Sequence, residues 1–479
     1  MRNILLINPS RSVFGKGKDI LFTNESLTPS LGIGYLAAYC RQHGIEVDIL
    51  DLRLPHRSLN DIEAYIGKRN YSLIGITAFT NEVFFAGIIA KFIKGNFPET
   101  LIAIGGPHAS IDPEGTLDEF PDFDFAVIGE GEETLLELIN GIDANKENNF
   151  VNIKGLALKK NGSVVLTERR SVLEDIDMLP LPAWDLFELK YYRKGLFMVM
   201  TSRGCPYSCY FCTPHYLGEK IRVRNYLNVV DEIEYINSNF GAIKIQFADA
   251  MISILKDNII RLCDEIIRRG LNKRIRWDCE TRADCLNPQL LNKMKKAGCR
   301  WVAIGVETGN ERILADVIGK KETKDQIRDG VKLCKKAAIK VRCFFVLGHY
   351  TETFETIRET IRFALELNPD ALAFGLLVPN PGTKIRQLAE IHAGGLRILH
   401  SRWQDYNQFN YSCMESEDLS LGDLKKWQAK AYFTFYLHHP GKALVLFLDK
   451  SGYNYKIKGI LHIPWMLLKN LFWKGKKQK

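Results

Sequence analysis

The chain has 479 residues, and at roughly 150 residues per domain this length predicts about three folded units. Hydrophobic residues make up 46% and charged residues 25% of the chain, which excludes a fibrous or mostly disordered protein. No apolar run approaches the ~18 residues that cross a bilayer, and the first apolar stretch is too short for a signal sequence, so we expect a cytoplasmic protein. The net charge of +9 is a mild basic excess that would suit an anionic partner without requiring one, and we expect no nucleic-acid partner.

Residues 1–145 alternate short apolar runs with amphipathic stretches. This alternation is typical of strand and helix units that build a parallel sheet. We predict an α/β domain with a doubly wound sheet of the Rossmann or flavodoxin type. The expected strands cover residues 4–8, 47–51, 73–77, 101–105 and 125–128, and the expected helices cover residues 31–43, 59–68, 82–97 and 132–139.

Residues 146–190 are interpreted as a hairpin followed by a linker. Asn161 and Gly162 give a hairpin turn signal between two short apolar runs, residues 153–158 and 163–167. The sequence Leu-Pro-Leu-Pro at residues 179–182 then stiffens the connection.

The alternation of strands and helices returns in residues 191–385. Six strand-helix units predict a partial (β/α)6 barrel similar to the TIM barrel. Residues 386–479 lose this periodicity and are first rich in aromatic residues and then helical, so we predict a mainly helical region that helps to select the substrate. The six expected strands cover residues 197–201, 243–248, 275–279, 301–305, 341–346 and 371–377.

Three cysteines follow the first barrel strand with the spacing Cys-x3-Cys-x2-Cys, at Cys205, Cys209 and Cys212. Loops after barrel strands line the face where barrel enzymes do their chemistry, and the glycine and proline on either side of Cys205 permit a tight turn. Three thiolates would leave one iron of a 4Fe-4S cluster open to a substrate or cofactor. Two alternatives remain open: a zinc site with His215 as the fourth ligand, and buried cysteines without a metal.

This motif, with an aromatic residue before its last cysteine, resembles that of the radical S-adenosylmethionine superfamily. The resemblance implies that the open iron binds the amino and carboxylate groups of S-adenosylmethionine, and that one-electron reduction releases a 5'-deoxyadenosyl radical. Cys205, Cys209 and Cys212 would then be metal ligands and catalytic residues, and Phe211 would pack near the adenine.

Polar residues also follow the later barrel strands, on the same predicted rim. Asp249 follows the second strand, Glu280 and Arg282 the third, and Glu307 the fourth. The family resemblance makes these four candidate contacts of S-adenosylmethionine, whereas a surface or capping charge is the alternative for each. His349 follows the fifth strand and is a candidate to face the substrate as an acid, base or hydrogen-bond donor, although a loop histidine can also have no such role.

Glycine-rich loops follow several strands of the first domain. Glycines let backbone amides approach a large flat or anionic ligand, although turn formation is the ordinary explanation. Together with residues 28–38, these loops resemble the cobalamin-binding domain that precedes the barrel in a large radical subgroup, and the resemblance covers about the first 385 residues. The cobalamin-binding residues that it implies are Ser30, Thr77, Gly105, Gly106, His108, Gly129, Glu130 and Gly131.

The chain lacks the Asp-x-His-x-x-Gly cobalt-ligand motif of other cobalamin proteins. The nearest match, residues 390–395, lies beyond the barrel. The resemblance therefore implies that cobalamin binds with its own base displaced and with no histidine of that motif below the cobalt. His108 is the only histidine in the strand-end loops, and it either faces the cobalt or has a simple turn role.

The leading functional hypothesis that the resemblance implies is cobalamin-dependent methyl transfer to an unactivated carbon of a small molecule, lipid or peptide. Cyclisation, rearrangement or oxidation without methylation would use the same parts, and a non-catalytic cobalamin and iron-sulfur binding protein is the alternative from another class. A methylthiolating enzyme that acts on transfer RNA is disfavoured, because only Cys40 precedes the triad.

We expect two further partners. The cluster would take electrons from an external donor such as flavodoxin or ferredoxin. Residues 465–479, an apolar stretch followed by lysines, are suited either to the surface of an anionic membrane or to packing on the barrel as a helix.

Overall fold

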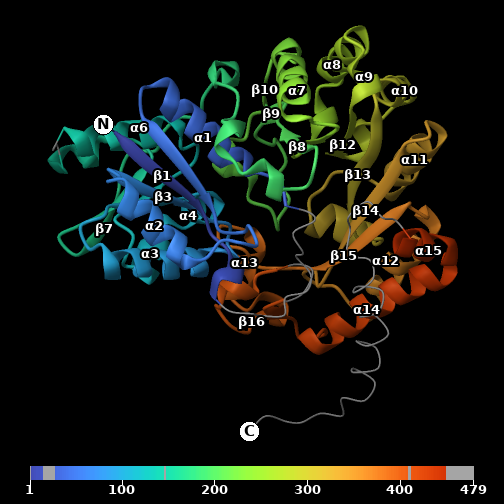
Figure 1. Cartoon of the computed structure of the whole chain (residues 1–479). Coiled ribbons are helices and arrows are strands. Elements are labelled where there is room, and N and C mark those ends of the chain that lie inside the picture. The colour runs from blue at the N-terminus through green and yellow to red at the C-terminus, as the bar shows by residue number, and fades with distance from the viewer. Residues whose placement is uncertain (1, 15–26, 145–146, 408–411, 449–479) are drawn as a thin grey trace.

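The computed structural model describes residues 2–14, 27–144, 147–407 and 412–448. Figure 1 shows two sheets side by side, a front sheet built from the first third of the chain and a barrel sheet built from its middle. The two-sheet α/β architecture predicted from the sequence is confirmed.

The front sheet has seven strands in the order β2-β1-β3-β4-β5-β6-β7, and β1 to β5 are parallel. Its first strand, β1 (Asn3–Asn8), is buried on both faces, because Leu5 and Ile7 join one hydrophobic core while Ile4 and Leu6 join the other. Open α/β sheets bind ligands where the strand order reverses, which here is between β1 and β3. The remaining parallel strands are β2 (Glu46–Asp51), β3 (Leu73–Thr77), β4 (Ile102–Gly105) and β5 (Phe125–Val127).

Helices cover both faces of this sheet. One core receives apolar side chains from α1 and α6, and the other from α2, α3, α4 and α5. The elements have the bounds α1 (Leu31–Gln42), α2 (Leu59–Lys68), α3 (Val83–Asn96), α4 (Pro107–Ile111), α5 (Pro113–Glu119) and α6 (Glu132–Asp143).

The hairpin predicted as part of a linker belongs to the front sheet. Its strands β6 (Leu156–Lys160) and β7 (Ser163–Leu166) continue the sheet beyond β5 in antiparallel sense. The hairpin satisfies the open backbone edge of β5 and buries Leu156 and Leu158 in the core, which explains why it does not act as a free connection.

The barrel sheet has six parallel strands in the chain order β8-β11-β12-β13-β14-β15, and it is open between its first and last strands. All six strands were predicted from the sequence. They are β8 (Leu196–Val199), β11 (Lys244–Phe247), β12 (Arg276–Thr281), β13 (Cys299–Glu307), β14 (Lys340–Leu347) and β15 (Ala371–Leu376).

Helices between these strands form the outer wall of the barrel (Figure 1). Their inward faces join a continuous core, for example through Leu262, Leu290 and Val331. The helices are α7 (Tyr226–Phe240), α8 (Lys256–Arg268), α9 (Leu271–Arg274), α10 (Pro288–Lys296), α11 (Lys324–Lys336) and α12 (Phe354–Leu367).

The C-terminal region joins the two halves. Trp403 donates a hydrogen bond from Nε1 to Glu119 of α5 (2.6 Å), and its ring lies 5.1 Å from that of His108, so this region packs on the front domain. At the other end α14 packs on β15. The region contains α13 (Lys384–Glu390), β16 (Arg397–Ile398), β17 (Met414–Glu415), α14 (Leu421–His438) and α15 (Pro440–Leu448).

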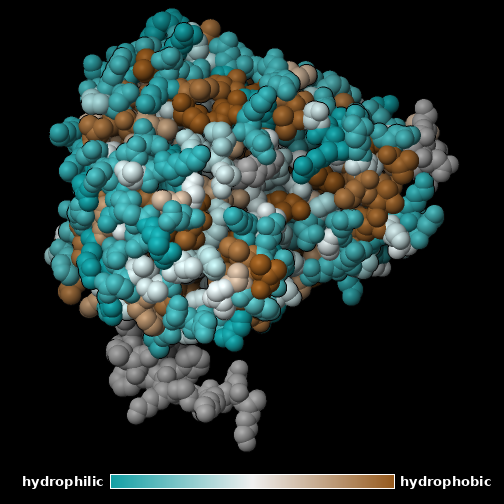
Figure 2. Space-filling view, turned by 180° about the vertical axis from the view of Figure 1, so that it is seen from behind, coloured by the Kyte–Doolittle hydropathy of each residue, from teal (hydrophilic) through white to brown (hydrophobic). Residues whose placement is uncertain are grey.

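The surface is mostly polar, with scattered patches of exposed hydrophobic side chains on the face shown in Figure 2. Among the described residues we find no helix with the length and apolar character that a membrane span requires. The apolar and basic segment at residues 465–479 lies outside the described residues.

Candidate functional site

The cysteine loop leaves the barrel directly after β8 and is closed at its base by a short antiparallel ladder. This ladder pairs β9 (Ser202–Arg203) with β10 (Arg222–Val223). Gly204 follows β9 with a φ of +92°, and a Cβ there would clash with the backbone carbonyl of Lys220. The sequence therefore requires glycine at the point where the loop turns toward its first cysteine.

The three cysteines of the loop are free thiols, with Cys205 and Cys209 half-buried and Cys212 exposed. Cys212 nevertheless has enough protein around it that burial raises the pKa of its thiol to about 12, and the nearby Cys209 and Cys205 add to this. Burial also raises the pKa of Cys209, against the effect of the Lys320 ammonium. Thiols that influence one another in this way are a suitable donor set for a shared cluster.

Among the described residues, no three histidine, cysteine or acidic side chains are grouped as the ligands of a single metal ion would be. Ligands of a cluster bind different irons and therefore lie further apart than ligands of one ion. The side chain of His215, the fourth ligand of the zinc alternative, lies outside the described residues.

Two cations lie beside the cysteine loop. Arg282 holds its guanidinium 4.2 Å from the ring of Tyr207 and donates to the backbone oxygen of Lys320 at 2.7 Å. The Lys320 ammonium lies 3.4 Å from the carboxylate of Glu307 and 3.3 Å from that of Glu322. Lys320 was missed in the sequence because it follows Gly319 in what reads as an ordinary charged turn.

The carboxylates of the predicted rim residues Glu280 and Glu307 lie close enough for Glu307 to influence the pKa of Glu280. Arg342 is the neighbouring cation of Glu280, and Lys320 that of Glu307. Burial raises the pKa of Glu280, with Arg342 opposing and Glu307 adding to the shift. Burial likewise raises the pKa of Glu307, with Lys320 opposing the shift. Glu307 has a φ of +67° at a register shift between β13 and β14, an unusual conformation for a residue other than glycine.

Asp249 is bonded within the protein at the start of the cysteine loop. Its buried carboxylate accepts hydrogen bonds from the backbone and hydroxyl of Thr201, at 3.1 Å and 2.8 Å, and from the hydroxyl of Ser202 at 2.6 Å. These bonds occupy the carboxylate within the protein, so Asp249 holds the start of the cysteine loop.

His349 also lies behind the loop and not in an open site. It is 1% exposed, and its Nδ1 lies 3.0 Å from the hydroxyl of Tyr210. Tyr210 stands between the second and third cysteines in the sequence. Burial lowers the pKa of His349 to about 3, so the ring is neutral at physiological pH. Its ring lies 6.1 Å from that of Phe211, so His349 packs against the cysteine loop.

The strand ends of the front sheet meet the cysteine loop. A Cβ on Gly129 would lie 3.6 Å from the backbone oxygen of Tyr216, which is in the second half of that loop. A Cβ on Gly382, after the last barrel strand, would meet both Ile111 of α4 and Thr213 of the loop. The predicted cobalamin edge and the predicted cluster loop are therefore neighbours.

The front-domain residues predicted as cobalamin contacts do not all lie in the same surroundings. Thr77, Gly105 and Gly106 lie at the ends of β3 and β4, on the edge that faces the barrel. His108 is instead buried under Trp403 with Nδ1 3.2 Å from the Thr80 hydroxyl, and burial lowers its pKa to about 4. Ser30 precedes α1 and Gly131 precedes α6, each without a side-chain cap, and the carboxylate of Glu130 is bound by arginines of the cysteine loop.

Two family models match the chain, the B12 binding domain over residues 17–139 and the radical SAM superfamily over residues 199–364. An uncharacterized methyltransferase of Pyrococcus horikoshii is 32% identical over 469 residues, which cover 97% of this chain and 98% of that protein. The chain belongs to the cobalamin-binding radical S-adenosylmethionine enzymes.

Other members of this family are similar along most of their length. The anaerobic magnesium-protoporphyrin IX monomethyl ester cyclase of Cereibacter sphaeroides is 27% identical, over 91% of this chain and 68% of that protein. The structure of the radical S-adenosylmethionine methyltransferase TsrM from Kitasatospora setae, with cobalamin and a 4Fe-4S cluster bound, has a TM-score of 0.75 and 20% identity, over 98% of this chain and 99% of that chain. The likeness to TsrM shows that the two proteins share one fold along nearly their whole length.

The cofactors of this radical enzyme are a 4Fe-4S cluster, S-adenosylmethionine and cobalamin, and its residues fit them. Three neighbouring thiols with Lys320 and Arg282 beside them suit an anionic cluster. At the front edge a Cβ on Gly105 would meet, among the described residues, only the side chain of Val127, at the ordinary contact distance of 3.8 Å. Phe79, at the end of β3, is 59% exposed and offers an apolar contact to a large flat ligand.

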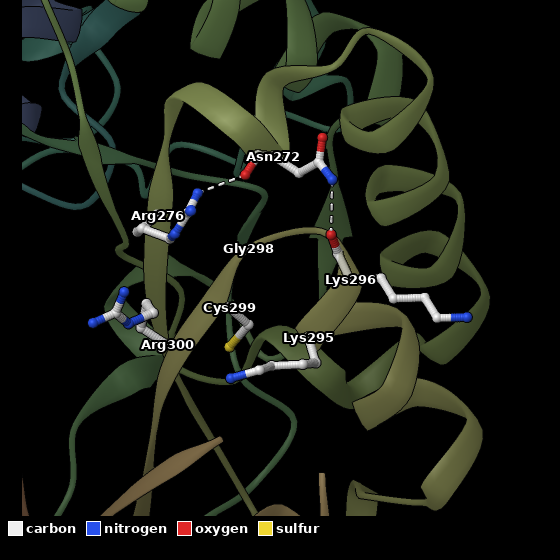
Figure 3. A pocket seen from close by; sticks show the side chains of 7 residues that line it. All are labelled: Asn272, Arg276, Lys295, Lys296, Gly298, Cys299 and Arg300. Atoms are coloured by element: carbon white, nitrogen blue, oxygen red, sulfur yellow. Dashed lines mark hydrogen bonds between the residues drawn. The ribbon is translucent and has the colours of Figure 1, made fainter. Parts of the chain in front are cut away.

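A separate hollow of about 350 Å³ lies at the opposite end of the barrel strands (Figure 3). It contains Arg276 and Arg300 near the starts of β12 and β13, and Lys295 and Lys296 at the end of α10. Within it Arg276 donates to the backbone oxygen of Asn272 at 2.5 Å. Because the cysteine loop is at the carboxyl ends of the strands, this hollow is not part of the candidate site.

Proposed function

We propose that this chain transfers a methyl group from S-adenosylmethionine to an unactivated carbon of a small-molecule, lipid or peptide substrate. The observation that carries this proposal is the contact between Gly129 of the front edge and Tyr216 of the cysteine loop. It makes the predicted cobalamin edge and the cluster loop direct neighbours. The name of the Pyrococcus relative supports the same reaction class.

The overall reaction consumes two molecules of S-adenosylmethionine. In the first, the bond between sulfur and the methyl carbon breaks, the sulfur keeps the electron pair, and S-adenosylhomocysteine leaves. In the second, one electron breaks the bond between sulfur and C5', which gives methionine and a 5'-deoxyadenosyl radical that takes a hydrogen atom from the substrate. The substrate carbon gains the methyl group, so two electrons are used and the removed hydrogen ends in 5'-deoxyadenosine.

The bound groups supply the redox chemistry, since the cluster delivers the electron to S-adenosylmethionine and cobalamin carries the methyl group. The chain holds the reacting molecules. In this proposal Glu280, Glu307 and Arg282 contact S-adenosylmethionine at the barrel rim, and Phe211 packs near its adenine. The proposal is supported by the influence of Glu307 and Arg282 on the pKa of the Cys209 thiol. In this proposal an external flavodoxin or ferredoxin supplies both electrons.

A second candidate is ring closure without methylation, which the similarity to the Cereibacter cyclase favours. Both candidates begin with radical formation from S-adenosylmethionine. They differ in whether S-adenosylhomocysteine is formed.

Product analysis tests the proposal. The chain is reconstituted without oxygen with iron, sulfide and cobalamin, reduced, and supplied with S-adenosylmethionine, and the products are measured by mass spectrometry. We expect both 5'-deoxyadenosine and S-adenosylhomocysteine. When cobalamin is omitted, we expect S-adenosylhomocysteine to disappear and 5'-deoxyadenosine still to form. Formation of 5'-deoxyadenosine alone in the presence of cobalamin would favour the cyclase-like candidate.

A further inference from the structure

The base of the cysteine loop carries two buried arginines that face each other. Arg203 of β9 and Arg222 of β10 are paired residues in the short antiparallel ladder that closes the loop. Like charges directly opposite each other on neighbouring strands repel, so the ladder needs a counter-charge. The side chains of Arg203 and Arg222 are 9% and 6% exposed, so solvent screens this repulsion little.

The counter-charge comes from the front domain. Glu130 accepts from Nη1 of Arg203 at 2.9 Å and from Nη1 of Arg222 at 2.8 Å, so one carboxylate bridges both strands of the ladder. Glu132 accepts from Nη2 of Arg203 at 2.6 Å. Both glutamates are at least as buried as the arginines, and the backbone amide of Leu173 completes the bonding of Glu130 at 2.8 Å.

The network also fixes the orientation of the base of the cysteine loop relative to the front domain. The planar fork of Arg203 spans two carboxylates at the start of α6, and its guanidinium lies 5.6 Å from the ring centre of Tyr35 in α1. Two residues further along the chain is Cys205, the first cluster ligand. A movement of α6 relative to the barrel therefore moves the base of the cluster loop.

We propose that Glu130 and Glu132 of the cobalamin domain are positioning residues for the cluster, which hold the cysteine loop at a fixed place relative to the cobalamin edge. The inference rests on the proposed function only for its effect on methyl transfer. Its effect on the cluster itself does not depend on that function.

The test compares Glu130→Gln with Glu133→Gln as a matched control. Glu133 is three residues further along, in the first turn of α6, and makes a partly exposed ion pair with Arg170. Each variant is reconstituted without cobalamin or substrate, and its iron and sulfide content and the electron paramagnetic resonance spectrum of the reduced cluster are measured with and without S-adenosylmethionine. We expect lower cluster content or an altered spectrum only in Glu130→Gln, and no change in either measurement in Glu133→Gln.

The coupled readout follows with cobalamin present. Displacement of a reacting group by about 1 Å can cost roughly a hundredfold in rate, so we expect S-adenosylhomocysteine formation by Glu130→Gln to fall by at least about tenfold relative to 5'-deoxyadenosine formation. Glu130→Asp keeps the charge and should restore part of the loss. Failure of the unmodified protein to form S-adenosylhomocysteine would contradict the proposed function but leave the cluster measurements to decide this inference.

Thermal melting of the cluster-free proteins separates positioning from folding. If Glu130→Gln does not fold, Arg203→Lys replaces it, because lysine keeps the charge but cannot span two carboxylates with a planar fork. A folded variant with the cluster content, spectrum and product ratio of the Glu133→Gln control would overturn the inference. A folded variant that binds the cluster with an altered spectrum or ratio would support it.

Discussion

At the scale of single residues, burial affects the protonation state of a side chain more than its position in the sequence does. Glu352 shows this most clearly, because it is 1% exposed and accepts hydrogen bonds from the backbone amides of Gly348 and His349 at only one of its oxygens. Burial raises its pKa from 4.5 to about 8, although those two bonds act in the opposite direction. The carboxyl is therefore protonated in the folded chain at neutral pH. Its second oxygen, Oε1, has no hydrogen-bond partner among the described residues.

This shift predicts a pH dependence of stability. Between the ordinary pKa of 4.5 and the raised value of about 8, the folded state binds more protons than the unfolded state, so the stability of the folded chain falls as the pH rises through this window. Glu352→Gln keeps an acceptor for the two amides and removes the titration. We expect its midpoint of urea unfolding, measured on the cluster-free chain, to fall less steeply from pH 5 to pH 8 than that of the unmodified chain.

Glu355→Gln is the control for this change, since Glu355 lies three residues further along, in the first turn of α12, and Arg358 and Arg362 on the surface hold its pKa below the ordinary value. It should leave the slope in this window unchanged. Parallel slopes for Glu352→Gln and the unmodified chain would show that Glu352 does not titrate as described.

Residue roles were also where the sequence predicted least. Strand ends could be located from apolar periodicity, and Arg282 and Glu307 at these ends lie close enough to Cys209 to influence the pKa of its thiol. The direction of a side chain depends on partners far away in sequence, such as Thr201 for Asp249 and Tyr210 for His349. Local pattern carries no information about these partners.

At the scale of elements, the last barrel strand needs a cover because a partial barrel has two open edges. Helix α14 supplies this cover at β15, where the Tyr432 hydroxyl accepts from the backbone amide of Phe374 at 2.9 Å and Gln428 donates to the backbone oxygen of Phe374 at 2.7 Å. Two side chains thus take the place of a seventh strand at this point.

This arrangement predicts that Tyr432→Phe destabilises the chain. Loss of the hydroxyl leaves the Phe374 amide without its acceptor, at a cost of about 1–3 kcal/mol in the free energy of unfolding. Tyr436→Phe, one turn further along α14, is the control and should cost less than about 0.5 kcal/mol. Equal midpoints of urea unfolding for the two variants would contradict this role of α14.

The periodicity of the sequence was sufficient for all eleven parallel strands that the structure contains in its two sheets, because most of them are short apolar runs that alternate with amphipathic helices. It was not sufficient for the place of the hairpin β6–β7. An Asn-Gly turn predicts a hairpin but does not indicate which edge the hairpin will join, and that choice follows from the free edge of β5.

At the scale of the whole molecule, the two cofactor domains act as one unit. The linker packs against α1 near Gly34, the C-terminal region packs on α5 through Trp403, and Glu130 joins the front domain to the loop base. The order of domains could be predicted from motifs, but these contacts could not, since none of them has a local sequence signature. They hold the front domain, the cysteine loop and the C-terminal region together.

The central claim is that Cys205, Cys209 and Cys212 hold a cluster that cleaves S-adenosylmethionine. The most direct test is the amount of 5'-deoxyadenosine that the reduced, reconstituted chain forms, compared with Cys209→Ala and with Cys334→Ala, whose cysteine is buried in α11 away from the loop. We predict 5'-deoxyadenosine from the unmodified chain and from Cys334→Ala, and none above background from Cys209→Ala. No 5'-deoxyadenosine from the unmodified chain, or an equal amount from Cys209→Ala, would contradict the claim.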